Sequence, residues 1–262
     1  MEINGHGGCL EHIQYSESAE SRQHHINLFG QPKVSQKNNM CEPTKENAVN
    51  RKIALAFVLM LAFAISLSYA ASRFPILPLD LQAYQELHEE ARPLFNMLLR
   101  GVSYLGEPAM AMILIVMVAA AFASRRQWIE TIFVLATTSN VLLTFVLKEL
   151  IRRARPVPLP GNATGFIQSI NEYSYPSGHV LFFVVFFGFF AYLAWIYFAG
   201  RVRVIVIAIC GALIILIGPS RVFLGAHWAS DVLGSYIIGA IWLFVLIIAY
   251  QWAMRWKHHD PS

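Results

Sequence analysis

The residues best suited to chemistry lie in three short segments in the second half of the chain. The last segment, Ser220 to Asp231, brings an arginine, a histidine and an aspartate close together. His227 and Asp231 are four residues apart, so on a helix the carboxylate can reach one ring nitrogen of the imidazole. That contact would fix the tautomer of His227 and leave its other nitrogen free as a nucleophile. Alone, Asp231 also fits a charge at a helix N-terminus, and His227 an interfacial side chain.

The middle segment, Pro176 to His179, precedes an apolar run that begins at Val180. Proline, serine and glycine here predict a turn into a helix N-terminus, where free N–H groups and the helix dipole favour an anion. Ser177 and Gly178 would then lie beside that anion. An ordinary capped helix start with an interfacial histidine would use the same residues.

The first segment, Lys148 to Pro156, is strongly basic. Lys148 and Arg155 are seven residues apart and would project from nearly the same face of a helix, so two cations would point one way. Arg152, four residues after Lys148, could face the same pocket. A single arginine at a helix end would more simply extend to lipid headgroups.

The composition indicates which elements must position these segments. Hydrophobic residues make up 56% of the chain and charged residues 14%, and the apolar residues lie in long runs. Because a bilayer-spanning helix needs about 20 mostly apolar residues, the sequence predicts an all-α integral membrane protein with six transmembrane helices. The predicted spans are Ile53–Ala71, Pro108–Ala123, Trp128–Leu147, Val180–Ala199, Val204–Gly218 and Val232–Met254.

The chain is predicted to have two parts. Residues 1–50 are polar without a sustained apolar period, so we expect a disordered cytoplasmic tail. Residues 51–262 form the six-span domain. Within it, the amphipathic segment Leu81–Arg100 predicts an interfacial helix, either a connector on the bilayer or a lid. The three cysteines have no paired or metal-like spacing, so neither a disulfide framework nor a zinc site is expected.

Basic residues orient the predicted spans. Pairs of arginine or lysine residues lie before the first span, between the second and third, between the fourth and fifth, and after the sixth. By the positive-inside rule, these loops and both termini face the cytoplasm. The three chemistry-bearing segments then share the extracytoplasmic face. This clustering at span ends also accounts for the net charge of +4 without a nucleic-acid partner.

One shared site explains the three segments better than separate structural roles do. The basic residues between Lys148 and Pro156 oppose the positive-inside bias, and a bound phosphate would explain them. The residues that such a site would bring together are Lys148, Arg155, Ser177, His179, Arg221, His227 and Asp231.

The three segments resemble the motifs of the type 2 phosphatidic acid phosphatase (PAP2) superfamily. Lys148 to Pro156 matches K-x6-R-P, Pro176 to His179 matches PSGH, and Ser220 to Asp231 matches S-R-x5-H-x3-D. The resemblance extends over the six-span region and leaves out the N-terminal tail. It implies a PAP2-like helical bundle and a phosphatase that uses neither a metal nor another cofactor.

The resemblance also implies a role for each matching residue. His227 would attack phosphorus to form a phosphohistidine, and Asp231 would hold and polarise the His227 imidazole. His179 would protonate the leaving oxygen. Arg152 lies at a position that the motif leaves open, and we hypothesise that it contacts a second phosphate. The phosphoryl oxygens would be bound by Lys148, Arg155, Arg221, the Ser177 hydroxyl and the Gly178 N–H.

These observations predict a multi-pass plasma-membrane phosphatase that hydrolyses a phosphomonoester or diphosphate lipid. Undecaprenyl diphosphate, phosphatidate and phosphatidylglycerol phosphate are the candidate substrates, and no particular oligomeric state is predicted. Two alternatives are a lipid phosphotransferase that uses the same residues, and a protein that binds or transports a lipid phosphate without turnover. A vanadate-dependent haloperoxidase is disfavoured because those enzymes are typically soluble.

Overall fold

The computed structural model describes residues 45–89, 93–156 and 173–259. These residues form helices joined by short turns, with one isolated β-bridge between Ala154 and Tyr173, which confirms the all-α prediction. The predicted tail lies outside the described residues up to residue 44, and its last six residues already belong to the first helix. The helices are α1 (Lys45–Arg73), α2 (Pro78–Glu89), α3 (Pro93–Leu105), α4 (Pro108–Ser124), α5 (Trp128–Ala136), α6 (Ser139–Ile151), α8 (Gly178–Phe182), the π-helical turn η1 (Phe183–Phe187), α9 (Gly188–Tyr197), α10 (Gly200–Phe223) and α11 (Ala229–His259).

The helices fit the predicted six-span membrane protein. Among the described residues, five helical segments are long and apolar enough to cross a bilayer, and α3 with α4, bent by 65°, gives a sixth if the pair is counted as one span. The third span continues past its predicted end, because α6 runs to Ile151 and so carries Lys148 on its last turn. The five segments are Arg51–Arg73, Trp128–Ile151, Gly178–Tyr197, Gly200–Phe223 and Ala229–Lys257.

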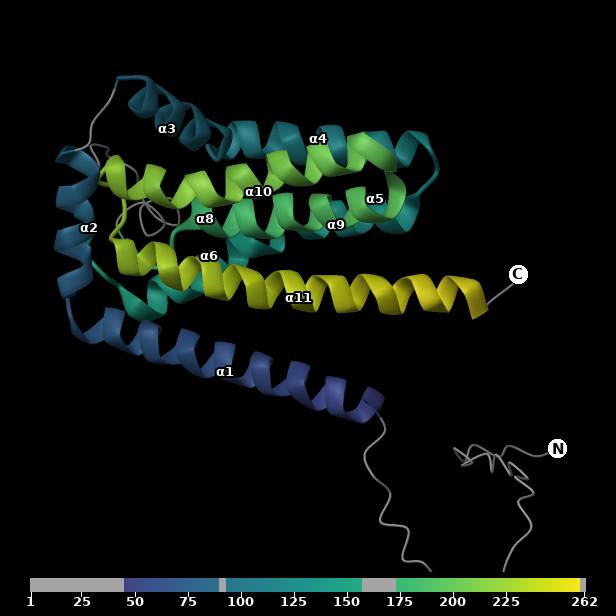
Figure 1. Cartoon of the computed structure of the whole chain (residues 1–262), viewed down its shortest axis with the longest axis horizontal. Helices are drawn as coiled ribbons and strands as arrows, with labels where there is room; N and C mark the ends of the chain where they lie inside the picture. Colours follow the sequence, from purple (N-terminus) through teal and green to yellow (C-terminus); the bar gives the residue numbers. More distant parts are fainter. Residues whose placement is uncertain (1–44, 90–92, 157–172, 260–262) are drawn as a thin grey trace, which may run out of the picture. The chain divides into compact units, whose positions relative to one another are not determined.

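The described residues of the segment Leu81–Arg100, predicted as one interfacial helix, belong to two helices. α2 ends at Glu89, and α3 begins at Pro93, where proline's fixed φ and missing N–H suit the first helical position. α2 lies across one end of the bundle and contacts α10 and α11 (Figure 1). The first part of this segment is therefore a connector packed on the bundle end.

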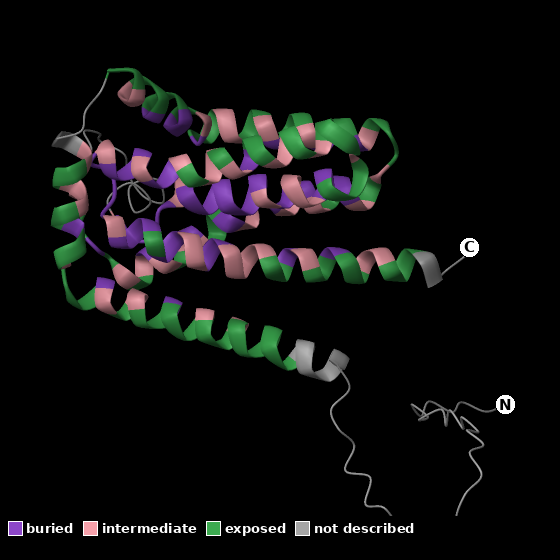
Figure 2. Ribbon diagram, viewed as in Figure 1, coloured by how far each residue is buried: buried purple, intermediate pink, exposed green. Residues whose placement is uncertain are grey.

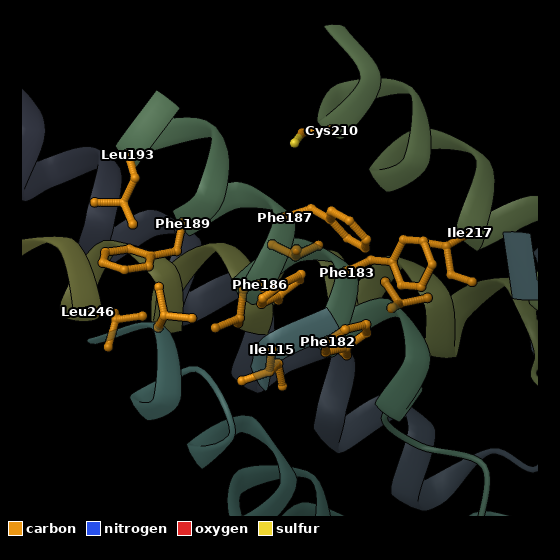
Figure 3. Packing of buried hydrophobic residues seen from close by; sticks show 14 of the residues in the cluster. Ile115, Phe182, Phe183, Phe186, Phe187, Phe189, Leu193, Cys210, Ile217 and Leu246 are labelled. Carbon is orange, nitrogen blue, oxygen red and sulfur yellow. The ribbon is translucent and has the colours of Figure 1, made fainter. Parts of the chain in front are cut away.

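The span Gly178–Tyr197 forms the centre of the bundle. In its most apolar stretch 61% of the residues are buried, against 6% for α1, which is exposed along most of its length as a lipid-facing helix would be (Figure 2). The aromatic rings of the central span interlock, and the rings of Phe182 and Phe186 stack with centroids 5.2 Å apart. Phe182, Phe183, Phe186, Phe187 and Phe189 are the centre of the core cluster (Figure 3).

The chemistry-bearing segments lie at the end of the bundle that α2 crosses. There α6 and α10 end, and α8 and α11 begin (Figure 1). The turns from α4 to α5 and from α9 to α10 lie at the opposite end (Figure 1). The fold thus gathers at one end three motifs that are separated along the chain.

Candidate active site

His227 occupies the turn between α10 and α11, and its side chain is buried, with 2% of the residue exposed. Its Nδ1 lies 2.7 Å from the carbonyl oxygen of Ser174. A carbonyl can only accept, so Nδ1 carries the proton and donates it, and in the neutral imidazole Nε2 then keeps its lone pair. The geometry therefore holds His227 in the tautomer that a nucleophile at Nε2 requires.

The electrostatic surroundings of His227 also favour the neutral imidazole. Burial lowers the pKa of His227 well below its usual 6.5, and three nearby cations lower it further. These cations are Arg155, Arg221 and Lys148. The structure thus brings the cations of two separate motifs around one neutral histidine.

Asp231 has different partners from the one expected. The part of the chain that the structure describes shows no hydrogen bond from Asp231 to His227. Asp231 accepts instead from Arg153 Nη1 at 2.5 Å and from the backbone N–H of Trp228 at 2.9 Å. The reason is local, because α11 begins only at Ala229 and His227 lies before the helix. Asp231 therefore reaches back to cap the N-terminus of its own helix, as in a capping box.

Arg153 and Asp80 form a buried ion pair that the sequence reasoning missed. Arg153 Nη2 donates to Asp80 Oδ2 at 2.6 Å, and Arg153 Nη1 also donates to Ser230 Oγ at 2.7 Å. Asp80 Oδ1 accepts from the backbone N–H of Ser230 at 2.8 Å. One guanidinium thus links α2 to the first turn of α11. An acidic residue in the otherwise apolar stretch Leu77–Leu81 was the available signal for such a pair.

Lys148 and Arg155 both lie near His227, but they do not belong to one helix as the helical periodicity predicted. α6 ends at Ile151, and Arg152 adopts a left-handed backbone with φ of 51°, so Arg155 does not share a helix face with Lys148. Lys148 Nζ donates to the carbonyl of Tyr173 at 2.8 Å, and Arg155 Nη1 donates to the carbonyl of Ala226 at 3.0 Å. Burial lowers the pKa of Arg155 to about 10, so it remains a cation at neutral pH.

Arg221 and His179 lie near His227, and each carries a buried nitrogen. Arg221 Nη1 donates to Ser103 Oγ at 2.5 Å, which ties α10 to α3. Among the described residues, Arg221 Nε and His179 Nε2 are buried without a hydrogen-bond partner. Because buried donors in folded proteins are normally satisfied, Arg221 Nε suits an anionic ligand, whereas His179 Nε2 lies 3.6 Å from the carboxylate of Glu107.

Ser177 and Gly178 open the central span as the sequence suggests. Ser177 is buried and is the N-cap of α8, and its Oγ accepts from the N–H of Val180 at 3.5 Å. Its own N–H donates to Ser235 Oγ at 2.6 Å. Since Oγ acts only as an acceptor in the cap, its hydroxyl proton can donate to a phosphoryl oxygen.

Arg152 does not join the other cations. Its side chain is 64% exposed and pairs with Glu149 at 3.2 Å, within the same turn. The predicted contact with a second phosphate assumed a helix that continued past Ile151, and the left-handed residue at the helix end turns Arg152 outward instead. The buried arginine of this motif is Arg153, and Arg155 is half-buried.

Glu107 is a further residue that the sequence reasoning missed. It lies at the break between α3 and α4, and its Oε1 is 3.6 Å from His179 Nε2. The neighbouring Gly106 packs on the same imidazole, since a Cβ at Gly106 would lie 2.5 Å from His179 Cδ2. An acidic residue next to Pro108 at the start of a predicted span was the only signal in the sequence.

This fold and site define a helical, multi-span membrane protein with two histidines near several buried or half-buried cations. Residues 129–255 match the model of the PAP2 superfamily. Over 158 residues the chain is 31% identical to phosphatidylglycerophosphatase B of Bacillus subtilis (strain 168), covering 59% of this chain and 75% of that protein. The chain belongs to the PAP2 superfamily.

A solved structure shares the fold. It is the transmembrane PAP2 type phosphatidylglycerolphosphate phosphatase from Bacillus subtilis, which is 28% identical and superposes with a TM-score of 0.61. The match covers 72% of this chain and 93% of that one. The helical bundle described above is therefore the architecture of a membrane PAP2 phosphatase.

Proposed function

We propose that this protein is a lipid phosphatase that works through a phosphohistidine on His227. The observation that carries the proposal is the setting of His227, which is buried, with Nδ1 held by the Ser174 carbonyl and with three cations nearby that lower its pKa. Binding a phosphate would need only the cations. A nucleophile held in a fixed tautomer is expected in a site that also performs chemistry.

The reaction would proceed in two displacements. His227 Nε2 attacks phosphorus, the bond from phosphorus to the leaving oxygen breaks, and protonated His179 gives its proton to that oxygen. Water then attacks the phosphohistidine, His179 takes a proton from this water, and the N–P bond breaks. Inorganic phosphate leaves, and both histidines return to their starting states.

The cations would replace the metal ions that many phosphoryl-transfer enzymes use. Lys148, Arg155 and Arg221 surround His227, so they can stabilise the charge on the transferring phosphoryl group. The Ser177 hydroxyl and the Gly178 N–H, at the start of the central span, would add two hydrogen bonds. Asp231 would act indirectly, by holding the first turn of α11 next to His227.

The first substrate to test is phosphatidylglycerol phosphate, because the names of the two relatives assign them that chemistry. Phosphatidate and undecaprenyl diphosphate are the comparison substrates. The positive-inside pattern supports cytoplasmic termini and a site that faces the extracytoplasmic side of the plasma membrane. A lipid phosphate in the outer leaflet would then approach the site from the bilayer.

The test is phosphate release by the detergent-purified protein in the presence of EDTA. We expect release by the wild type, and a loss of about a thousandfold or more in His227→Ala. Arg152→Ala is the matched control, because its side chain is exposed and paired with Glu149, and it should keep wild-type activity. Loss of wild-type activity in EDTA with recovery on adding Mg²⁺ would contradict the metal-free mechanism. Phosphate appearing on an added acceptor lipid instead of in water would identify a phosphotransferase.

A further inference from the structure

Glu107 has a carboxylate that the proposed reaction leaves unused. It is the N-cap residue of α4, but its side chain makes no capping hydrogen bond. The carboxylate instead faces His179, with 3.6 Å between Oε1 and Nε2, and the side chain is 52% exposed. The group is therefore close to the acid of the reaction and open to a ligand.

His179 places Glu107 on the leaving-group side of the site. Nε2 of His179 is buried without a hydrogen-bond partner among the described residues, so it is the atom available to the leaving oxygen. A proton donor and its acceptor must lie about 3 Å apart. Together with the 3.6 Å from Nε2 to Oε1, this puts the Glu107 carboxylate within about 7 Å of the leaving oxygen.

The charge near that oxygen differs between the two classes of substrate. A phosphomonoester leaves as a neutral alcohol, and a glycerol-type alcohol carries hydroxyl groups that can donate to a carboxylate. A diphosphate lipid leaves as a lipid phosphate, whose negative charge would lie beside Glu107. Arg152, the residue expected to hold a second phosphate, is turned outward and paired with Glu149.

We propose that Glu107 is a specificity-determining residue, which disfavours diphosphate lipids and favours phosphomonoesters of glycerol-type alcohols. The proposal rests on the proposed function, in which His179 protonates the leaving oxygen. Repulsion between Glu107 and an anionic leaving group would act at short range in a partly exposed site, so its effect on relative rates is moderate. A hydrogen bond from a hydroxyl group of a glycerol-type leaving group to the Glu107 carboxylate would also favour the phosphomonoester.

The experiment compares kcat/KM for phosphatidylglycerol phosphate and for a polyprenyl diphosphate, using the full chain in detergent. The variants are Glu107→Gln, which keeps the shape without the charge, and Glu107→Lys, which reverses the charge. We expect the ratio of the two kcat/KM values to move toward the diphosphate by about tenfold in Glu107→Gln and further in Glu107→Lys. Glu149→Gln removes a partly exposed carboxylate at the end of α6 and should leave the ratio unchanged.

The outcomes separate this proposal from the proposed function. A ratio equal to the wild-type ratio in both Glu107 variants, even if both rates fall, would overturn the specificity role and leave Glu107 only as a support for His179. Full activity in His227→Ala would instead overturn the proposed function itself. Because Glu107 is half exposed and makes no capping bond, neither substitution is expected to unfold the protein, and thermal unfolding checks this directly.

Discussion

At the scale of single residues, the site depends on small differences in where a side chain points. Arg152 and Arg153 are neighbours in a basic motif, yet one is exposed and the other is buried between two carboxylates. His227 takes its orientation from a backbone carbonyl, whereas Asp231 serves the start of α11. The backbone carbonyl of Ser174, and not the carboxylate of Asp231, therefore holds the imidazole of His227 in position.

Gly106 gives a prediction at this scale. In Gly106→Ala the new Cβ would meet the His179 ring at 2.5 Å, so the imidazole must shift away from its position beside Glu107. A displacement of about 1 Å in a catalytic group can lower the rate about a hundredfold. We therefore expect kcat to fall by about tenfold or more. The measurement is steady-state phosphate release.

The matched control for this prediction is Gly101→Ala, on α3, where a Cβ would meet nothing within 4 Å. Alanine also favours a helix interior over glycine. Gly101→Ala should therefore keep its activity and its thermal stability. Equal activities in the two variants would show that Gly106 does not set the position of His179.

At the scale of elements, the buried pair of Asp80 and Arg153 fastens α2 to the start of α11. Arg153 lies between Asp80 and Asp231, with 2.6 Å and 2.5 Å to their oxygens. Removing one partner of a buried ion network leaves uncompensated charge, which is costly in a site of low dielectric. The first turn of α11 and the adjacent His227 therefore depend on a connector far away in the sequence.

Arg153→Met gives the corresponding prediction. Two buried carboxylates would then face each other without a cation, so we expect a loss of roughly 3–5 kcal/mol in stability and a large drop in activity. Adding Asp80→Asn removes one of the two charges and should recover part of both losses. Thermal unfolding and phosphate release measure them together. A double variant no better than Arg153→Met would contradict the network.

The elements also show why the sequence predicted some features and missed others. Spans and motifs follow from apolar runs and local spacing, so the convergence of the three motifs at one end of the bundle was predictable. The helix α6 ends at Ile151 because Arg152 adopts a left-handed backbone conformation. Since no glycine lies at this position, the sequence does not predict the helix end or the exposure of the Arg152 side chain. The contacts of Asp80 and Glu107 join segments more than seventy residues apart, and no periodicity encodes them.

At the scale of the whole molecule, the bundle keeps its chemistry and its anchoring charges at opposite ends. The site lies where α6 and α10 end and α8 and α11 begin, whereas the basic turns from α4 to α5 and from α9 to α10 lie at the other end (Figure 1). This separation supports the proposed orientation, because positive residues favour the cytoplasmic side. Between the two ends, the phenylalanine side chains of the central span form the buried core.

The central claim is that the phosphoryl group passes through His227, and trapping the phosphorylated protein tests it most directly. Wild-type protein mixed with lipid substrate labelled in its phosphate should be quenched in alkali, where phosphohistidine survives, and then digested for mass spectrometry. We expect label on His227 in the wild type, and none in His227→Asn. Turnover of the substrate with no label on His227, or label retained in His227→Asn, would contradict the account.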